Sequence, residues 1–181
     1  MKRSIFGSII CRNICRIGYG AMRITGPGIW GPPTNVQESI RLIKMAIDLG
    51  VQHIDTADSY GPFVSEEIIK KALYPYNENL LIATKGGFMR NGPGQWEANG
   101  KPHYLRRCIE GSLRRLKLEA LDLYYLHRVD EKIPLLDQVG ELSILKKEGK
   151  IKNIGLSKVT LQQIKESIKI DKIAAIQNKF N

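Results

Sequence analysis

Four polar side chains at the ends of apolar runs could together perform acid–base chemistry. Asp55 and Tyr60 lie in HIDTADSYG, Lys85 closes LLIATK, and His127 follows LDLYYL. A tyrosine can give a proton to a carbonyl oxygen, and a nearby ammonium favours the phenolate and lowers the phenol pKa. We therefore expect Lys85 to tune Tyr60, Asp55 to orient Lys85, and neutral His127 to bond the substrate oxygen or assist proton transfer. Any one of them could instead be an ordinary strand-end polar residue.

These residues can meet only if the fold brings distant strand ends together. Six strand-like runs, at residues 16–22, 52–56, 80–85, 121–126, 151–156 and 174–177, alternate with amphipathic helical patterns. Such alternation is typical of βα units and a parallel sheet. In a parallel α/β barrel the loops after the strands converge on one face. The sequence predicts a single α/β domain over residues 1–181, a TIM-type (β/α)8 barrel that is incomplete, with about six of eight units present.

Capping signals mark where several of the helices begin. Thr34 with Gln37 predicts a capping box before the first helix, and Thr160 with Gln163 predicts another before the last. Pro134 suits the first turn of the helix that follows the fourth strand. Together with the amphipathic patterns, these signals predict one helix after each of the first five strands.

The number of units sets a second expectation. A closed barrel of this type has eight units and usually about 250 residues, so a six-unit sheet would leave its first and sixth strands unpaired on one side. Open edges favour self-association. We interpret the chain as an N-terminal portion of a longer protein or as a truncated gene product.

Composition narrows the classes of partner. The chain has 181 residues, 43% of them hydrophobic, with 17 Gly and 8 Pro, which is typical of one globular unit. The net charge of +10 could suit nucleic acid, but the basic residues are scattered in pairs on helix faces without interleaved aromatics. We expect neither a nucleic-acid partner nor, since no apolar run approaches about 20 residues, a membrane partner. A basic cleft for an anionic small ligand fits the same charge.

The N-terminal stretch and the cysteines bear on location. MKRSIFGSIICRNIC has a basic start and a short apolar segment, but arginines follow in place of a cleavage site, so a leading β-hairpin is preferred to a signal peptide. Cys11, Cys15 and Cys108 show neither CxxC spacing nor a companion His pair. The sequence therefore predicts no metal site and no disulfide framework, and a cytoplasmic protein.

Three motifs carry a family resemblance that covers nearly the whole chain. D-T-A-x-x-Y-G, T-K-G and L-x-x-L-H, each at a strand end, resemble the aldo-keto reductase family. The resemblance implies NADPH-dependent reduction of aldehydes or ketones to alcohols by hydride transfer. It also implies the catalytic set Asp55, Tyr60, Lys85 and His127, with Tyr60 as general acid. A non-catalytic nucleotide-binding relative and an inactive gene fragment are the alternatives.

The resemblance further implies where the cofactor would lie. Gly20, Ala21 and Met22 match the end of the first strand near the nicotinamide ribose, and Ser157 and Gln177 match positions that hold the carboxamide. One departure is Lys158, where the family usually has Asn, because an ammonium has no acceptor. The implied cofactor-binding set is Gly20, Ala21, Met22, Asp55, Ser157, Lys158 and Gln177.

Loop aromatics suggest a substrate pocket. Trp30, Phe88 and Trp96 lie in loops after the first and third strands and could wall an apolar pocket for a small carbonyl substrate, or simply seal the barrel mouth. The nearby glycines 26, 28 and 31 spell G-x-G-x-x-G, but Pro27 lies inside the motif and no helix begins at it. We interpret that segment as a turn-rich loop.

Overall fold

A computed structural model describes residues 14–179 of the chain, and the expected N-terminal hairpin, like Cys11, lies outside these residues. Six strands form one sheet in which every neighbouring pair is parallel. In spatial order they are β1 (Tyr19–Gly20), β2 (His53–Asp55), β3 (Leu81–Gly86), β6 (Leu123–Leu126), β7 (Ile154–Ser157) and β8 (Ile173–Gln177).

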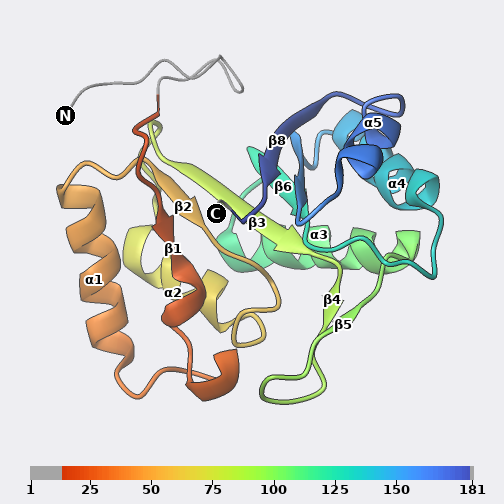
Figure 1. Cartoon of the computed structure of the whole chain (residues 1–181). Helices are drawn as coiled ribbons and strands as arrows, with labels where there is room; N and C mark the ends of the chain where they lie inside the picture. Colours follow the sequence, from red (N-terminus) through yellow and green to blue (C-terminus); the bar gives the residue numbers. More distant parts are fainter. Residues whose placement is uncertain (1–13, 180–181) are drawn as a thin grey trace.

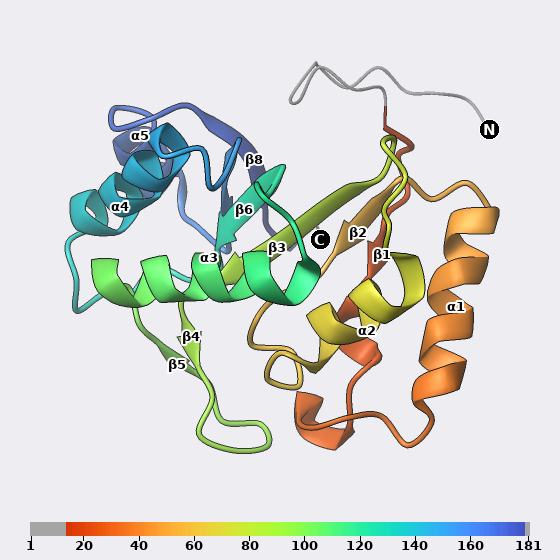
Figure 2. The ribbon, with the colours of Figure 1, turned by 180° about the vertical axis from the view of Figure 1, so that it is seen from behind.

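Five helices cover one face of this curved sheet, as Figures 1 and 2 show from opposite sides. Each helix packs beside the next one along the chain. None of them, within the described residues, could cross a bilayer. The arrangement is a parallel half-barrel, so the predicted incomplete barrel is confirmed. The helices are α1 (Val36–Asp48), α2 (Val64–Leu73), α3 (Pro102–Leu116), α4 (Leu135–Lys147) and α5 (Leu161–Ser167).

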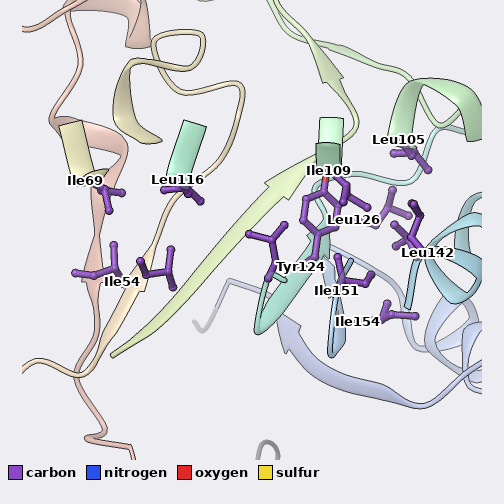
Figure 3. Close-up of a cluster of buried hydrophobic side chains, with 14 of the residues drawn as sticks. Ile54, Ile69, Leu105, Ile109, Leu116, Tyr124, Leu126, Leu142, Ile151 and Ile154 are labelled. Atoms are coloured by element: carbon purple, nitrogen blue, oxygen red, sulfur yellow. The ribbon is translucent and has the colours of Figure 1, made fainter. Parts of the chain in front are cut away.

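The main core lies between the sheet and the helices. Alternate strand residues point outward, because successive side chains on a strand face opposite sides. Ile54, Tyr124 and Ile154 are such residues, and they are buried together with helix residues such as Ile109 and Leu142. Figure 3 shows this cluster. Burial of the apolar face of each helix holds the helices against the sheet.

The inner face of the sheet carries a smaller cluster of Leu81, Ala83, Leu123 and Tyr125. Gly155 lies opposite Tyr125 on the neighbouring strand. A Cβ atom at Gly155 would lie only 2.4 Å from Cδ1 of Tyr125, so glycine makes room for the ring.

The inward alternation continues toward the carboxyl ends of the strands. Each of three polar residues lies two positions after a residue of the inner face: Lys85 after Ala83, His127 after Tyr125 and Ser157 after Gly155. The strand period of two therefore delivers these three side chains to the inner side of the half-barrel, above the small cluster.

Two local predictions were wrong, and one loop contains more structure than expected. The side chain of Asn35, not Thr34, caps α1, accepting from the Glu38 N–H at 3.0 Å. The first strand is shorter than residues 16–22, because the chain turns into a 3₁₀ helix, η1 (Ala21–Arg23), directly after β1. The long loop after β3 contains an antiparallel hairpin, β4 (Phe88–Met89) and β5 (Glu97–Ala98). The capping box of Thr160 with Gln163 is confirmed.

Candidate active site

Lys85 and Asp55 form a close ion pair at the ends of β3 and β2. The Lys85 side chain is 1% exposed, and its Nζ lies 2.7 Å from Asp55 Oδ2 and 2.8 Å from the carbonyl oxygen of Thr56. Burial lowers the pKa of Lys85, and Asp55 acts in the opposite direction. Asp55 therefore helps to keep the buried ammonium charged and points it toward the inner side of the half-barrel.

Tyr60 lies beside this pair, in the loop after β2. Lys85 Nζ is 5.3 Å from the centre of the Tyr60 ring, and the residue is 7% exposed. The pKa of Tyr60 is raised, first by burial and then by Asp55, while Arg128 opposes the shift. This differs from the lowering expected from Lys85, whose ammonium already donates to Asp55 and Thr56. The phenol is consequently held in its protonated form, the form a proton donor needs.

His127 completes the group from the end of β6. Its Nδ1 lies 3.3 Å from Ser59 Oγ, and its ring meets the Tyr60 ring edge-on at 5.7 Å between centroids. Burial and then the cations Lys85 and Arg128 lower the pKa of His127 well below its usual value. The imidazole is therefore neutral, in agreement with the state expected from the sequence.

A pocket of about 550 Å³ opens at this end of the sheet. Eight residues expected at the site line it, and Gly20, Ala21 and Trp30 do not. Ala21 is buried, and its carbonyl accepts a hydrogen bond from Ser65 Oγ at 2.9 Å. Asp55 and Lys85 lie just outside the lining. The lining residues are Met22, Tyr60, Phe88, Trp96, His127, Arg128, Ser157, Lys158, Gln177, Asn178 and Lys179.

The charges of the lining fit an anionic nucleotide. Arg128, Lys158 and Lys179 are cationic, and among the described residues no Asp or Glu lines this pocket. The hydroxyl of Ser157 and the amide of Gln177 add donors and acceptors suited to a carboxamide. The N–H of Lys158 donates to the carbonyl of Gln177 at 3.0 Å, which ties the ends of β7 and β8 together. The donor set thus fits a nicotinamide nucleotide.

Two arginines of the site were not identified from the sequence. The Arg128 guanidinium donates to the His127 carbonyl at 2.7 Å and to Ser157 Oγ at 3.3 Å, linking β6 to β7. Arg90 stacks on the Trp96 ring, 3.6 Å from its centre, and lies 5.6 Å from the Trp30 ring. Arg128 could have been predicted from the sequence, because it directly follows His127. Arg90 could not, because its hydrogen-bond acceptors are backbone carbonyl oxygens, which every residue type carries.

The glycine-rich segment behaves as a turn. The Gly26 N–H donates to the Gly31 carbonyl at 2.9 Å, closing the loop on itself around a short 3₁₀ helix, η2 (Pro27–Ile29). Across residues 14–179, no group of three or more His, Cys, Asp or Glu side chains is arranged to hold a metal ion.

The half-barrel, with a pocket at the carboxyl ends of its strands, places the chain in the class of βα-barrel proteins. The family model of the aldo/keto reductase family matches residues 16–181, and the chain belongs to this family.

Among curated relatives, an uncharacterised oxidoreductase of Schizosaccharomyces pombe is 48% identical over 166 residues, covering 92% of this chain and 54% of the relative. Pyridoxine 4-dehydrogenase of Escherichia coli is 39% identical over 176 residues, covering 94% of this chain and 62% of that enzyme. The chain thus spans little more than half of the length of these relatives.

Solved structures of similar proteins have the same fold over this part of their length. A glycerol dehydrogenase of Gluconobacter oxydans superposes with a TM-score of 0.84 at 32% identity, covering 93% of this chain and 52% of the other. An aldo-keto reductase of Klebsiella pneumoniae in complex with NADPH has a TM-score of 0.69 at 26% identity, covering 87% of this chain and 50% of the other.

Proposed function

We propose that the protein reduces aldehydes or ketones to alcohols with NADPH, and that Tyr60 is the general acid. The observation that carries this proposal is the position of the Tyr60 phenol. It is protonated and lies in the pocket wall, beside the Lys85–Asp55 pair and the neutral ring of His127.

In this proposal each side chain has a distinct task. Tyr60 gives its proton to the carbonyl oxygen, and the Lys85 ammonium stabilises the phenolate that remains. If Ser59 donates to Nδ1 of His127, the ring proton lies on Nε2, from which it can bond the same carbonyl oxygen. Asp55 keeps Lys85 oriented throughout.

The cofactor and the substrate would occupy the two sides of the pocket. Bound NADPH supplies the hydride for the carbonyl carbon, and Ser157, Gln177 and Lys158 would hold it. NADPH is supported by its presence in the Klebsiella structure, and alcohol–carbonyl chemistry by the names of the two dehydrogenases. Phe88 and Trp96, 5.4 Å apart between ring centres, favour a carbonyl compound with an apolar or aromatic group.

A cytoplasmic location is part of the proposal. Cys15 and Cys108, the two described cysteines, are free thiols, which suits a reducing compartment.

The test begins with NADPH titration of the 181-residue chain, following cofactor fluorescence and melting temperature together. Saturable binding with a raised melting temperature is expected. Carbonyl-dependent oxidation of NADPH is then measured for the chain and for Tyr60→Phe, which keeps the ring and removes the acid. A fall in kcat of roughly 10²- to 10⁴-fold is expected.

The remaining outcomes separate the alternatives. Binding without turnover would indicate a non-catalytic nucleotide-binding protein, and absence of binding by a folded sample would indicate an inactive fragment. Unchanged turnover in Tyr60→Phe would remove Tyr60 from its proposed role while leaving the reductase activity in place.

A further inference from the structure

The guanidinium of Arg90 is fully engaged with backbone carbonyls. Arg90 directly follows β4, and its Nε donates to the Gln95 carbonyl at 2.8 Å. Its Nη1 donates to Ile29 at 3.0 Å and to Ser59 at 2.6 Å, and its Nη2 to Gly28 at 3.1 Å and to Gly92 at 3.4 Å. A guanidinium has five N–H donors, one on Nε and two on each Nη. All five are used.

The five carbonyls belong to three separate loops. Gly28 and Ile29 lie in the loop after β1, Ser59 in the loop after β2, and the other two in the β4–β5 hairpin, which extends beyond the end of β3 in Figure 1. One side chain therefore fastens together three of the loops at the pocket end of the half-barrel. A backbone hydrogen bond from the Gly94 N–H to the Gly28 carbonyl, at 3.1 Å, reinforces the same junction.

We propose that Arg90 is a positioning residue for Tyr60, an inference that rests on the proposed function. The Ser59 carbonyl that accepts from Arg90 belongs to the peptide unit whose nitrogen is that of Tyr60. The Tyr60 N–H in turn donates to the Ala57 carbonyl at 3.3 Å. The peptide plane in front of Tyr60 is thus held at both its oxygen and its nitrogen.

The same contact reaches His127 and the pocket wall. Ser59 is the residue whose hydroxyl lies 3.3 Å from His127 Nδ1, so fixing its backbone also fixes the partner of the imidazole. Trp96, on which the Arg90 guanidinium stacks, lies 6.5 Å from the His127 ring between centroids. Arg90 therefore orients the proposed acid, the histidine partner and one aromatic wall from behind, without itself lining the pocket.

Neither lysine nor methionine at position 90 can make the five hydrogen bonds of the Arg90 guanidinium. A lysine ammonium has three donors around one atom, whereas the carbonyls around Arg90 are spread along a planar fork. Methionine keeps the packing against Trp96 and donates nothing. We expect Arg90→Lys and Arg90→Met each to lower kcat by about 10- to 100-fold, because a displacement near 1 Å at the reacting group has effects of that size. The KM for NADPH should stay within about threefold, since Arg90 contacts neither β7 nor β8.

Two matched controls and a second readout make the test decisive. Arg41, an exposed arginine of α1 paired with Glu38, is changed to Lys and to Met, and neither change should alter kcat. Amide hydrogen exchange is measured in parallel, because it requires no activity. Exchange at residues 57–63 should accelerate in the Arg90 variants while α4 keeps its protection.

The outcomes separate this inference from the proposed function. Faster exchange at 57–63 in a chain without reductase activity would uphold the loop junction but not the positioning role, and would count against the proposed function. Either of two results would overturn the role of Arg90: kcat unchanged within twofold in both variants, or a loss explained entirely by weaker NADPH binding. If Arg90→Met does not fold, Arg90→Lys, which keeps the charge, distinguishes the same outcomes.

Discussion

Two buried ion pairs lie on opposite faces of β3, and they differ in how completely their atoms are satisfied. On the inner face Lys85 pairs with Asp55, and on the outer face the neighbouring residue Thr84 donates to Glu66, which also accepts from Arg115. Glu66 is fully buried, and each of its two carboxylate oxygens has a partner. The outer pair is a closed network.

The inner pair is open. Asp55 Oδ1 is buried and has no hydrogen-bond partner among residues 14–179. Such an unpaired acceptor is costly in a folded protein, and one that persists calls for an explanation. Asp55 lies next to Tyr60 and the pocket, and a role of this carboxylate in the proposed reaction would explain why the unpaired oxygen is tolerated. The comparison teaches that similar charge pairs on the two sides of one strand can differ in how completely they are satisfied, and in the proposed function only the open pair takes part in the chemistry.

The largest expected effect comes from breaking the inner pair. Lys85→Met removes the ammonium that, in the proposed function, would stabilise the Tyr60 phenolate, and kcat should fall by roughly 10²- to 10⁴-fold. Urea unfolding should change less, because burial lowers the pKa of Lys85, and replacing its buried ammonium by an apolar side chain removes a desolvation cost that offsets part of the lost pair. A large loss of stability with kcat retained in the folded fraction would reverse the assignment of the two pairs.

Breaking the outer pair should give the opposite result. Glu66→Gln leaves Arg115, 17% exposed, without its counter-charge, and should lower the free energy of unfolding by about 3–5 kcal/mol. The kcat of the folded protein should stay within a few-fold. Urea denaturation measures the first quantity, with Glu38→Gln, in the exposed pair on α1, as the control that leaves the unfolding midpoint in place.

A third carboxyl sharpens the comparison through pH. Burial and then Glu66 raise the pKa of Asp58 to about 7, while its hydrogen bond with Cys108 acts in the opposite direction. Since the folded pKa lies above the unfolded one, the folded state binds the extra proton. The Asp58 contribution to stability is therefore full below about pH 4 and is lost as the pH rises to about 7.

This loss amounts to roughly 1.4 kcal/mol per pH unit within that window. Denaturation of the parent chain and of Asp58→Asn at several pH values measures it. In Asp58→Asn the free energy of unfolding should fall less steeply with rising pH between about pH 4 and pH 7. Equal slopes of the free energy of unfolding against pH in the two proteins would show that Asp58 does not titrate as described.

The smallest expected effect concerns two lysines with left-handed backbone. Lys117, at the end of α3, has φ 52°, and Lys158, at the pocket, has φ 50°. Asn tolerates this conformation better, so Lys117→Asn and Lys158→Asn should each raise the free energy of unfolding by about 0.5 kcal/mol. Only the second should change the affinity for NADPH. Equal nucleotide affinity in both variants would exclude Lys158 from the binding site.

The arrangement around β3 was largely predictable because strand alternation is a rule of the backbone. Once the run ending at Lys85 is recognised as a strand, its last residue must lie two positions from Ala83 on the same face, and the ends of parallel neighbours must converge. Glu66 could also have been found, since it precedes Ile69 by three positions and shares the buried face of α2.

Other features could not be predicted, for physical reasons. The segment Thr34-Asn35-Val36-Gln37-Glu38 contains two overlapping pairs that suit a helix start, Thr34 with Gln37 and Asn35 with Glu38, and residue type alone does not choose between them; in the structure Asn35 is the N-cap. The contacts of Arg90 end on carbonyl oxygens, which every residue type carries. The raised pKa of Tyr60 depends on burial, which only the assembled loops create.

The fit of Gly155 against Tyr125 limits how this sequence can vary during evolution. Any larger side chain at position 155 must displace an aromatic ring whose centre lies only 5.9 Å from Lys85 Nζ. A substitution on β7 would thus disturb a charge on β3 through the ring between them. Position 155 is therefore expected to resist drift as strongly as the residues that would touch the substrate.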